Sequence, residues 1–486
     1  MTWIGDHGLA LALLGVYTAL MVYHAWIGQR RTRGWLDFFV AGRSLGGVTL
    51  GISFFATYAS TNSYVGFSGQ AYSYGLSWLL LVPFAVGFTW MAWIWVAPRL
   101  RERTASLGSV TIPDFIGFRF ASTPARVGAA LLVLFSSVIY MTAVFKGIGN
   151  LLEAVLEVPY WTAIGMVLVV VMLYTAVGGF HSVVRTDVIQ GGMMIVAAVV
   201  LFTGTWRAAG GWEPISQAVD QVPSSVAGPL PLTLLLGVIF ATTIKALVEP
   251  RQLSRFYALE DERAVRQGTW ISPGIFLLVF SLLTPIGLFA RRILPPGLED
   301  TDRVVPALLA GGEVFGPFVS AFLFVAMVSA AMSSLDSVLL VVASTCERDL
   351  VGLVWKGRSE RARLQSTRIY VALFAVVTAL VALNPPGGVV SITAFSGSLY
   401  AACFLPSLMF GLYWNRGNGQ AVLASYAAGI ACLIIWPHLP EGALVHRVFP
   451  AVILSTLAYV SVSLLTPPAS PVSEVADSGS SVREMA

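Results

Sequence analysis

The stretch GISFFATYASTNSYVGFSGQAYSYG, from Gly51 to Gly75, decides the fold of this chain. Its middle consists of Ala, Thr, Ser, Asn and Gly, an unusual composition for a segment that faces lipid. It is typical of a membrane helix that breaks near the bilayer midplane, where unwound backbone survives only in protein or beside a cavity. Freed carbonyls at such a break can hold a cation. Small polar residues also pack helices together, so the stretch alone leaves both interpretations open.

The composition around this stretch is that of a membrane protein. Of the 486 residues, 56% are hydrophobic and 11% are charged, whereas roughly a quarter of a soluble chain is charged. Many apolar runs reach the roughly 20 residues that cross a bilayer as a helix. We therefore expect an all-α integral membrane protein and exclude soluble enzymes.

Apolar windows bounded by charge, Pro or Gly predict thirteen transmembrane helices. They lie near 7–27, 47–73, 76–97, 125–149, 160–179, 186–206, 231–248, 269–290, 315–345, 368–384, 389–413, 419–437 and 448–465. The first window lacks a basic segment before it and is expected to be a retained helix. Residues 1–465 are expected to form a single transmembrane domain, and 466–486, rich in Ser, Pro, Val and Glu, a disordered cytoplasmic tail.

The distribution of basic residues predicts the orientation. Twenty-two lysines and arginines fall in the connections after odd-numbered spans and in the tail, against five in the other connections. Because cytoplasmic connections are enriched in Lys and Arg, the N-terminus is predicted to lie outside and the C-terminus in the cytoplasm. The protein is thus expected in the plasma (inner) membrane.

The predicted ninth span carries a row of hydroxyls. In VSAAMSSLDSVLLVVAS, one helix face presents Ala330, Ser333, Ser334 and Ser337. Asp336, a carboxylate deep in the same apolar helix, indicates a functional site because an unpaired charge is costly there. Asp187, at the start of the sixth span, is the other acid placed to face the bundle, although a helix-terminal acid satisfied by the macrodipole is the alternative.

Motifs of soluble chemistry are missing. The sequence contains no Walker loop, no HExxH and no Cys/His metal cluster. ATP-driven pumping and hydrolysis lose their usual support, and we expect no enzyme and no nucleic-acid partner.

Five motifs, in order along the chain, carry a family resemblance. They are AGRSLGG (Ala41–Gly47), TIPDFIGFRF (Thr111–Phe120), YTAVGGFHSVVRTDVIQ (Tyr174–Gln190), MSSLDSVLLV (Met332–Val341) and GLYWNR (Gly411–Arg416). With them the chain resembles the sodium:solute symporter family, nearest to its pantothenate, monocarboxylate and proline branches. The resemblance implies an APC/LeuT-like core of two inverted five-helix repeats, about 47–206 and 231–413, with the site between them.

The resemblance also implies ion ligands. The main sodium ion is expected at the carbonyls of Ala56, Ala59 and Ala330 and the hydroxyls of Ser333 and Ser334. Some members hold a second ion, and the matching residues are Asp187, Asp336 and Ser337. Asp336 stands where those members have a hydroxyl, so a second sodium or a proton remains open.

Midplane placement on core helices suggests the solute site. The candidate residues are Asn62, Ser63, Tyr64, Tyr140, Phe240, Thr243, Lys245, Phe395 and Ser396. Apolar Val82 would satisfy a sugar poorly, and the proline transporters have Trp where Asn62 stands. Lys245 either offsets a solute carboxylate or snorkels to the cytoplasmic face.

The sequence therefore predicts a sodium-coupled symporter that imports a small carboxylate or amino-acid-like compound by alternating access. Its expected partners are the solute, Na+ and the lipid bilayer. A proton-coupled symporter of the same fold is the nearest alternative. A solute sensor would need a cytoplasmic output domain, which the short tail does not provide, and a channel would need a continuous polar lining.

Overall fold

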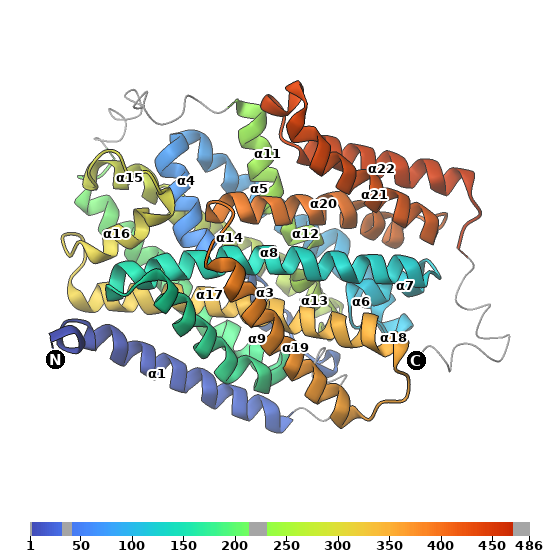
Figure 1. Ribbon diagram of the computed structural model, residues 1–486, viewed down its shortest axis with the longest axis horizontal. Coiled ribbons are helices and arrows are strands. Elements are labelled where there is room, and N and C mark those ends of the chain that lie inside the picture. The colour runs from blue at the N-terminus through green and yellow to red at the C-terminus, as the bar shows by residue number, and fades with distance from the viewer. Residues whose placement is uncertain (1, 32–40, 213–230, 470–486) are drawn as a thin grey trace.

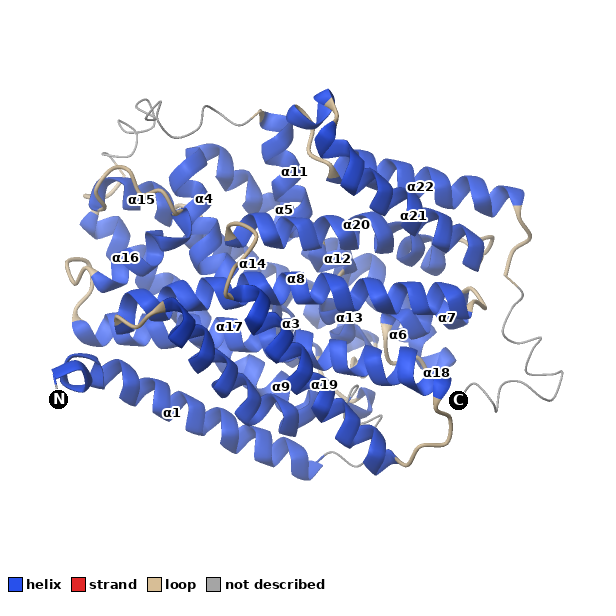
Figure 2. Ribbon diagram, in the orientation of Figure 1, coloured by secondary structure: helices blue, strands red, loops and turns tan. Residues whose placement is uncertain are grey.

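A computed structural model describes residues 2–31, 41–212 and 231–469, and this part of the chain is helical (Figure 2). Within these described residues, eleven helices are long and apolar enough to cross a membrane, and Gly47–Tyr58 and Tyr160–Met172 are shorter apolar helices. The all-α membrane fold is confirmed. The count of thirteen spans and the inverted repeat stay predictions.

The first half of the chain forms α1 (Thr2–Arg31), α3 (Gly47–Tyr58), α4 (Phe67–Tyr74), α5 (Leu81–Met91), α6 (Ala97–Leu107), α7 (Ile112–Arg119), α8 (Thr123–Leu156) and α9 (Tyr160–Ala208). The second half forms α11 (Leu232–Thr243), α12 (Lys245–Val248), α13 (Pro250–Tyr257), α14 (Glu262–Leu283), α15 (Ile286–Ile293), α16 (Val304–Ala310), α17 (Pro317–Thr345), α18 (Gly352–Val354), α19 (Glu360–Ala382), α20 (Val389–Tyr413), α21 (Gly419–Ile435) and α22 (Val448–Leu465). Short 3-10 helices include η3 (Gly75–Leu80) and η5 (Thr301–Arg303), and short π-helices include η2 (Asn62–Gly66), η4 (Ala92–Val96) and η6 (Cys346–Val351).

The predicted break in the opening stretch is present. Helix α3 ends at Tyr58, and Ala59 follows in an extended conformation, with φ −67° and ψ 116°. The chain resumes as the wide turn η2 and then α4. The whole of this break is buried, so its irregular backbone is enclosed by protein rather than lipid.

Two predicted spans are joined without a loop. The windows 160–179 and 186–206 form the single helical element α9, which kinks at Gly179, where φ is 64°. Only glycine adopts such a left-handed φ at little cost, so Gly179 allows a sharp change of direction in place of a connection.

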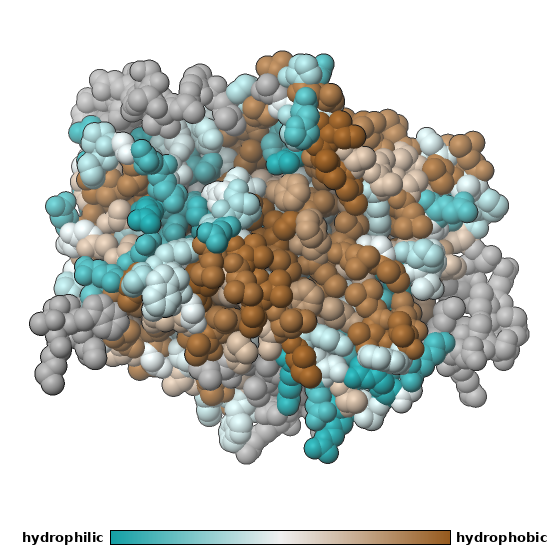
Figure 3. All heavy atoms as spheres, viewed as in Figure 1, coloured by the Kyte–Doolittle hydropathy of each residue, from teal (hydrophilic) through white to brown (hydrophobic). Residues whose placement is uncertain are grey.

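The long helices run roughly parallel along the molecule, and α17 lies in their midst (Figure 1). Helix α17 contacts α9, α8, α1 and α3, and its side chains from Ala321 to Thr345 are almost all buried. Hydrophobic side chains cover the middle of the face in Figure 3, while hydrophilic ones gather toward its two ends. This is the pattern expected of a protein whose waist lies in a bilayer.

Part of the predicted cytoplasmic tail, 470–486, lies outside the described residues, as do 32–40 and 213–230. Helix α1 starts at one end of the molecule, and α22 finishes at the other (Figure 1).

Candidate functional site

Ser334 links α17 to the broken helix. Its Oγ donates to the carbonyl of Thr57 at 2.9 Å and to that of Ala59 at 3.4 Å. Ala56 and Ala330 are fully buried. The structure thus brings the predicted hydroxyl to the carbonyls of the break, and it adds Thr57, which the sequence reasoning missed.

Ser333 turns toward a different partner. Its Oγ donates to Asp187 Oδ1 at 2.6 Å. The two neighbouring serines therefore have different hydrogen-bond acceptors: Ser334 donates to the carbonyls of the break, and Ser333 donates to the carboxylate of Asp187. The ion role assigned to Ser333 stays a prediction.

Asp187 lies at the centre of a buried polar cluster. Its carboxylate accepts from Ser53 at 2.5 Å and from Arg255 Nη2 at 2.8 Å. The same Nη2 donates to Ser337 at 2.6 Å and to Thr57 Oγ1. The acid and the hydroxyl predicted for a second cation thus surround a guanidinium.

Arg255 is a member of this cluster that the sequence reasoning missed. Arg255 and Arg251 are two of the twenty-two basic residues that the sequence analysis counted in the connections after odd-numbered spans and in the tail. In the structure α13 packs against α3, α6 and α17, both side chains are buried, and both lie within Leu232–Tyr257, a helical segment apolar and long enough to cross a membrane, rather than in an exposed connection. The available signal was the sequence PRQLSRFY itself, which spaces two arginines one helical turn apart.

Asp336 is a buried carboxylate on α17. Thr175 on α9 donates a hydrogen bond to Asp336 Oδ1, and Asp336 is buried. A hydroxyl from another helix is the kind of partner that a buried carboxylate needs.

Lys245 belongs to a second buried charge cluster. Its Nζ lies 3.7 Å from Glu249 Oε1 and 3.7 Å from the centre of the Tyr140 ring. Arg251 Cζ lies 3.9 Å from the centre of that ring, and its Nε is 2.9 Å from Glu249 Oε1. The side chain of Lys245 is 2% exposed, so the expectation that it snorkels to the cytoplasmic face is wrong.

The backbone of α20 closes over this lysine. A side chain at Gly397 would meet the carbonyl oxygen of Ala241 at 1.8 Å and Cδ of Lys245 at 3.1 Å. Glycine is therefore required where α20 crosses α11 and α12. The neighbouring Ser396 exchanges hydrogen bonds with Ser136 on α8.

The other candidate solute residues are dispersed. Tyr64 OH donates to the carbonyl of Met194 at 2.6 Å, and Thr243 Oγ1 donates within its own helix to Ile239. Phe240 contacts Phe88 and Phe449, Phe395 lies under Arg447, and Asn62 and Ser63 are buried on η2. Tyr140, Lys245 and the α20 backbone beside Ser396 meet, whereas Phe240 and Phe395 contact residues near α22.

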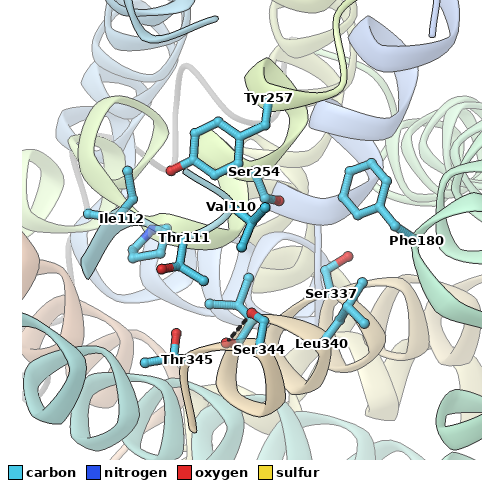
Figure 4. Close-up of a pocket in the computed structure, with 12 residues that line it drawn as sticks. Val110, Thr111, Ile112, Phe180, Ser254, Tyr257, Ser337, Leu340, Ser344 and Thr345 are labelled. Atoms are coloured by element: carbon cyan, nitrogen blue, oxygen red, sulfur yellow. Dashed lines mark hydrogen bonds between the residues drawn. The ribbon is translucent and has the colours of Figure 1, made fainter. Parts of the chain in front are cut away.

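A pocket (Figure 4) is lined in part by Ser337, which belongs to the Asp187 cluster. The cavity is small, with a volume of about 20 Å³. Ser337, Ser254 and Phe180 line its inner part. The Arg255 guanidinium lies 5.4 Å from the centre of the Phe180 ring. Thr111 and Thr345 line the same pocket, so it connects the cluster with the end of α17.

Ion pairs connect α8 to neighbouring elements near both ends of the bundle. At one end, Arg126 on α8 pairs with Asp114 at 2.7 Å and with Asp349 at 2.8 Å. At the other, Lys146 on α8 pairs with Asp302 at 2.7 Å, and Asp302 accepts from the backbone N–H of Val389 at the start of α20. Burial raises the pKa of the Asp302 carboxyl, and Lys146 partly opposes this rise.

A helical bundle with a membrane-spanning waist, a helix broken in its interior and buried charges around the break defines a membrane transporter. The sodium:solute symporter family model matches residues 38–429, and the chain belongs to that family. It is accordingly a multi-pass membrane protein that couples solute transport to Na+, and it is not an enzyme.

Individual relatives agree. The chain is 27% identical to a sodium/pantothenate symporter of Haemophilus influenzae, over 92% of this chain and 96% of that protein. It is 28% identical to an osmoregulated proline transporter of Bacillus subtilis, over 93% and 94%. Its fold matches a Na+-coupled sialic acid symporter with TM-score 0.81 at 17% identity, over 95% of this chain and 98% of that one. The resemblance that the motifs carried is confirmed.

Proposed function

We propose that this protein imports a small carboxylate or amino-acid-like solute together with Na+ by alternating access, with the N-terminus outside and the C-terminus in the cytoplasm. The observation that carries the proposal is the position of Ser334 at the carbonyls of Thr57 and Ala59. A monovalent cation needs several oxygen dipoles at once, and the end of a broken helix supplies them together with a neighbouring hydroxyl.

The solute would bind close to that ion. Arg251 Nη1 donates to the carbonyl of Thr57 at 2.7 Å, and the Arg251 side chain lies on the Tyr140 ring. The proposed ion ligands and the Lys245 cluster therefore share one residue of the break. An ion that orders this backbone would order the solute site with it, which is the coupling that symport requires.

Uptake into proteoliposomes tests the proposal. Labelled pantothenate, proline and a panel of short carboxylates would be offered with an inward sodium gradient, or with an inward proton gradient and no sodium. Saturable uptake with the sodium gradient alone is expected. Equal uptake with the proton gradient and no sodium would favour the proton-coupled alternative, and flux that does not saturate would indicate a channel.

A further inference from the structure

The charges around Tyr140 do not balance. Among the described residues, the basic side chains of Lys245 and Arg251 both pair with the one carboxylate of Glu249, and all three side chains are at most 3% exposed. An uncompensated charge in the membrane interior is costly, and such residues mark the path of a substrate. One additional negative charge would therefore neutralise the cluster.

Arg251 and Lys245 differ in how well they are satisfied. Arg251 Nη1 donates a hydrogen bond to the carbonyl of Thr57 at 2.7 Å, whereas its Nε lies 2.9 Å from Glu249 Oε1 without forming a hydrogen bond. Lys245 Nζ lies 3.7 Å from Glu249, beyond hydrogen-bond length, although an ammonium has three protons to donate. Lys245 is therefore the cation that can accept a new partner without breaking the structure.

Unused polar atoms adjoin the same ring. The hydroxyl of Tyr140 and Oε2 of Glu249 are buried and have no hydrogen-bond partner among the described residues. Buried polar groups are rarely left unpaired unless a ligand or water completes them. The hydroxyl can donate to an anion, whereas Glu249 Oε2 can only accept from a donor.

From these contacts we infer that the transported solute is a monoanion whose carboxylate is bound by Lys245 and the hydroxyl of Tyr140, and that also carries a hydroxyl or amide donor for Glu249. This rests on the proposed function and names its substrate class. A zwitterion would leave the surplus charge of the cluster in place, and a neutral sugar would do the same. A monocarboxylate removes it.

Matched solutes separate the charge classes. Pantothenate would be compared with its neutral alcohol, panthenol, and proline with the isosteric monoanion tetrahydrofuran-2-carboxylate, within a panel of hydroxy and amide monocarboxylates. Binding is measured as thermal stabilisation of the purified protein in sodium, and transport as uptake. Monoanions are expected to be favoured over their matched partners by about tenfold or more. Preference for zwitterions, or failure of every monocarboxylate, overturns the inference.

Two variants shift the selectivity in opposite directions. Lys245→Met should weaken monoanion binding by about 30-fold or more, while Lys245→Arg retains part of it. Glu249→Gln keeps an acceptor for Arg251 but adds one net positive charge, so it should gain binding of a dicarboxylate such as succinate. Misfolding cannot produce that gain. Unchanged charge selectivity in both Lys245→Met and Glu249→Gln refutes the inference.

The sodium proposal fails differently. Monoanion uptake that needs no sodium would refute sodium coupling and leave the charge inference standing. Sodium-dependent uptake restricted to zwitterions would refute only the charge inference.

Discussion

Arg255 Nη2 donates to Asp187 Oδ2 over 2.8 Å and joins two residues 68 positions apart in the chain. The hydroxyl oxygens of Ser53, Thr57 and Ser337 lie around the same guanidinium. A carboxylate ringed by hydroxyls is a set of oxygen ligands suited to a small cation. Here a side-chain cation already neutralises it.

Removing that cation should open a second ion requirement. In wild type we expect uptake to depend on sodium with a Hill coefficient of about one, because Asp187 is already paired. Arg255→Met leaves the carboxylate alone, and the Hill coefficient should rise toward two as sodium takes the vacant place. An unchanged coefficient in an active Arg255→Met protein would contradict this prediction.

The same pair predicts a stability pattern. Removing one partner of a buried ion pair typically costs about 3–5 kcal/mol, whereas replacing both is often tolerated. Arg255→Met should therefore lower the melting temperature clearly in sodium-free buffer, and the double variant Asp187→Asn with Arg255→Met should recover much of it. Equal melting temperatures for the single and double variants would show that the pair is not coupled.

The two serines of α17 should respond differently to truncation. Ser334→Ala removes the hydroxyl at the carbonyls of Thr57 and Ala59. A lost contact of about 1–2 kcal/mol raises the sodium concentration for half-maximal uptake roughly 5–30-fold. Ser333→Ala should also raise it, but less, since Ser333 donates to Asp187. Solute affinity at saturating sodium is the control and should move little. Wild-type sodium dependence in both variants would remove these serines from the ion site.

The break in the second predicted span is the feature that the sequence predicted most closely. The small polar residues between Ala56 and Asn62 predicted a break, and the chain breaks at Ala59. The hydroxyl face of α17 was also visible from helical spacing. Arg255 was not, because its partner Asp187 comes from a distant segment and the one-turn spacing of the two arginines in PRQLSRFY does not identify that partner. Lys245 shows the same limit, since its place under Gly397 depends on how α12 and α20 cross.

The Lys146–Asp302 pair predicts a pH-dependent opening. Asp302 holds Lys146 of α8 and the N–H of Val389 of α20, and Asp300 lies 3.8 Å from the same ammonium. Burial raises the pKa of Asp302. The carboxyl therefore protonates at higher pH than an ordinary aspartate, and the tie is lost as pH falls through that raised value. The free energy of unfolding changes in the other direction: because the native state holds this proton more tightly than the unfolded state does, the protein gains stability as pH falls through this range, although the ion pair is lost.

Thiol labelling measures this opening. If the N-terminus lies outside as proposed, a cysteine at Thr393, buried near the start of α20, should react faster with an impermeant reagent as external pH falls, relative to a fully exposed cysteine. Asp302→Asn should react fast at every pH. Glu153→Gln, which removes the partner of Arg303 in the neighbouring exposed pair, is the matched control and should keep the wild-type pH profile. Labelling that ignores pH in wild type would exclude the tie as a gate.

One sodium ion and one monoanion together carry no net charge, so transport by the wild-type protein should ignore the membrane potential. Each elementary charge moved across 100 mV is worth about 2.3 kcal/mol, which a potassium diffusion potential set with valinomycin can supply. Initial uptake rates are therefore expected to be the same at zero and at inside-negative potential. Arg255→Met, if it binds a second sodium ion at Asp187, should become faster at inside-negative potential. The double variant Asp187→Asn with Arg255→Met has neither charge and should again be insensitive. Strong stimulation of the wild type by an inside-negative potential would mean either a second coupled cation or an uncharged solute, and the measured sodium Hill coefficient would tell which of the two charge assignments is wrong.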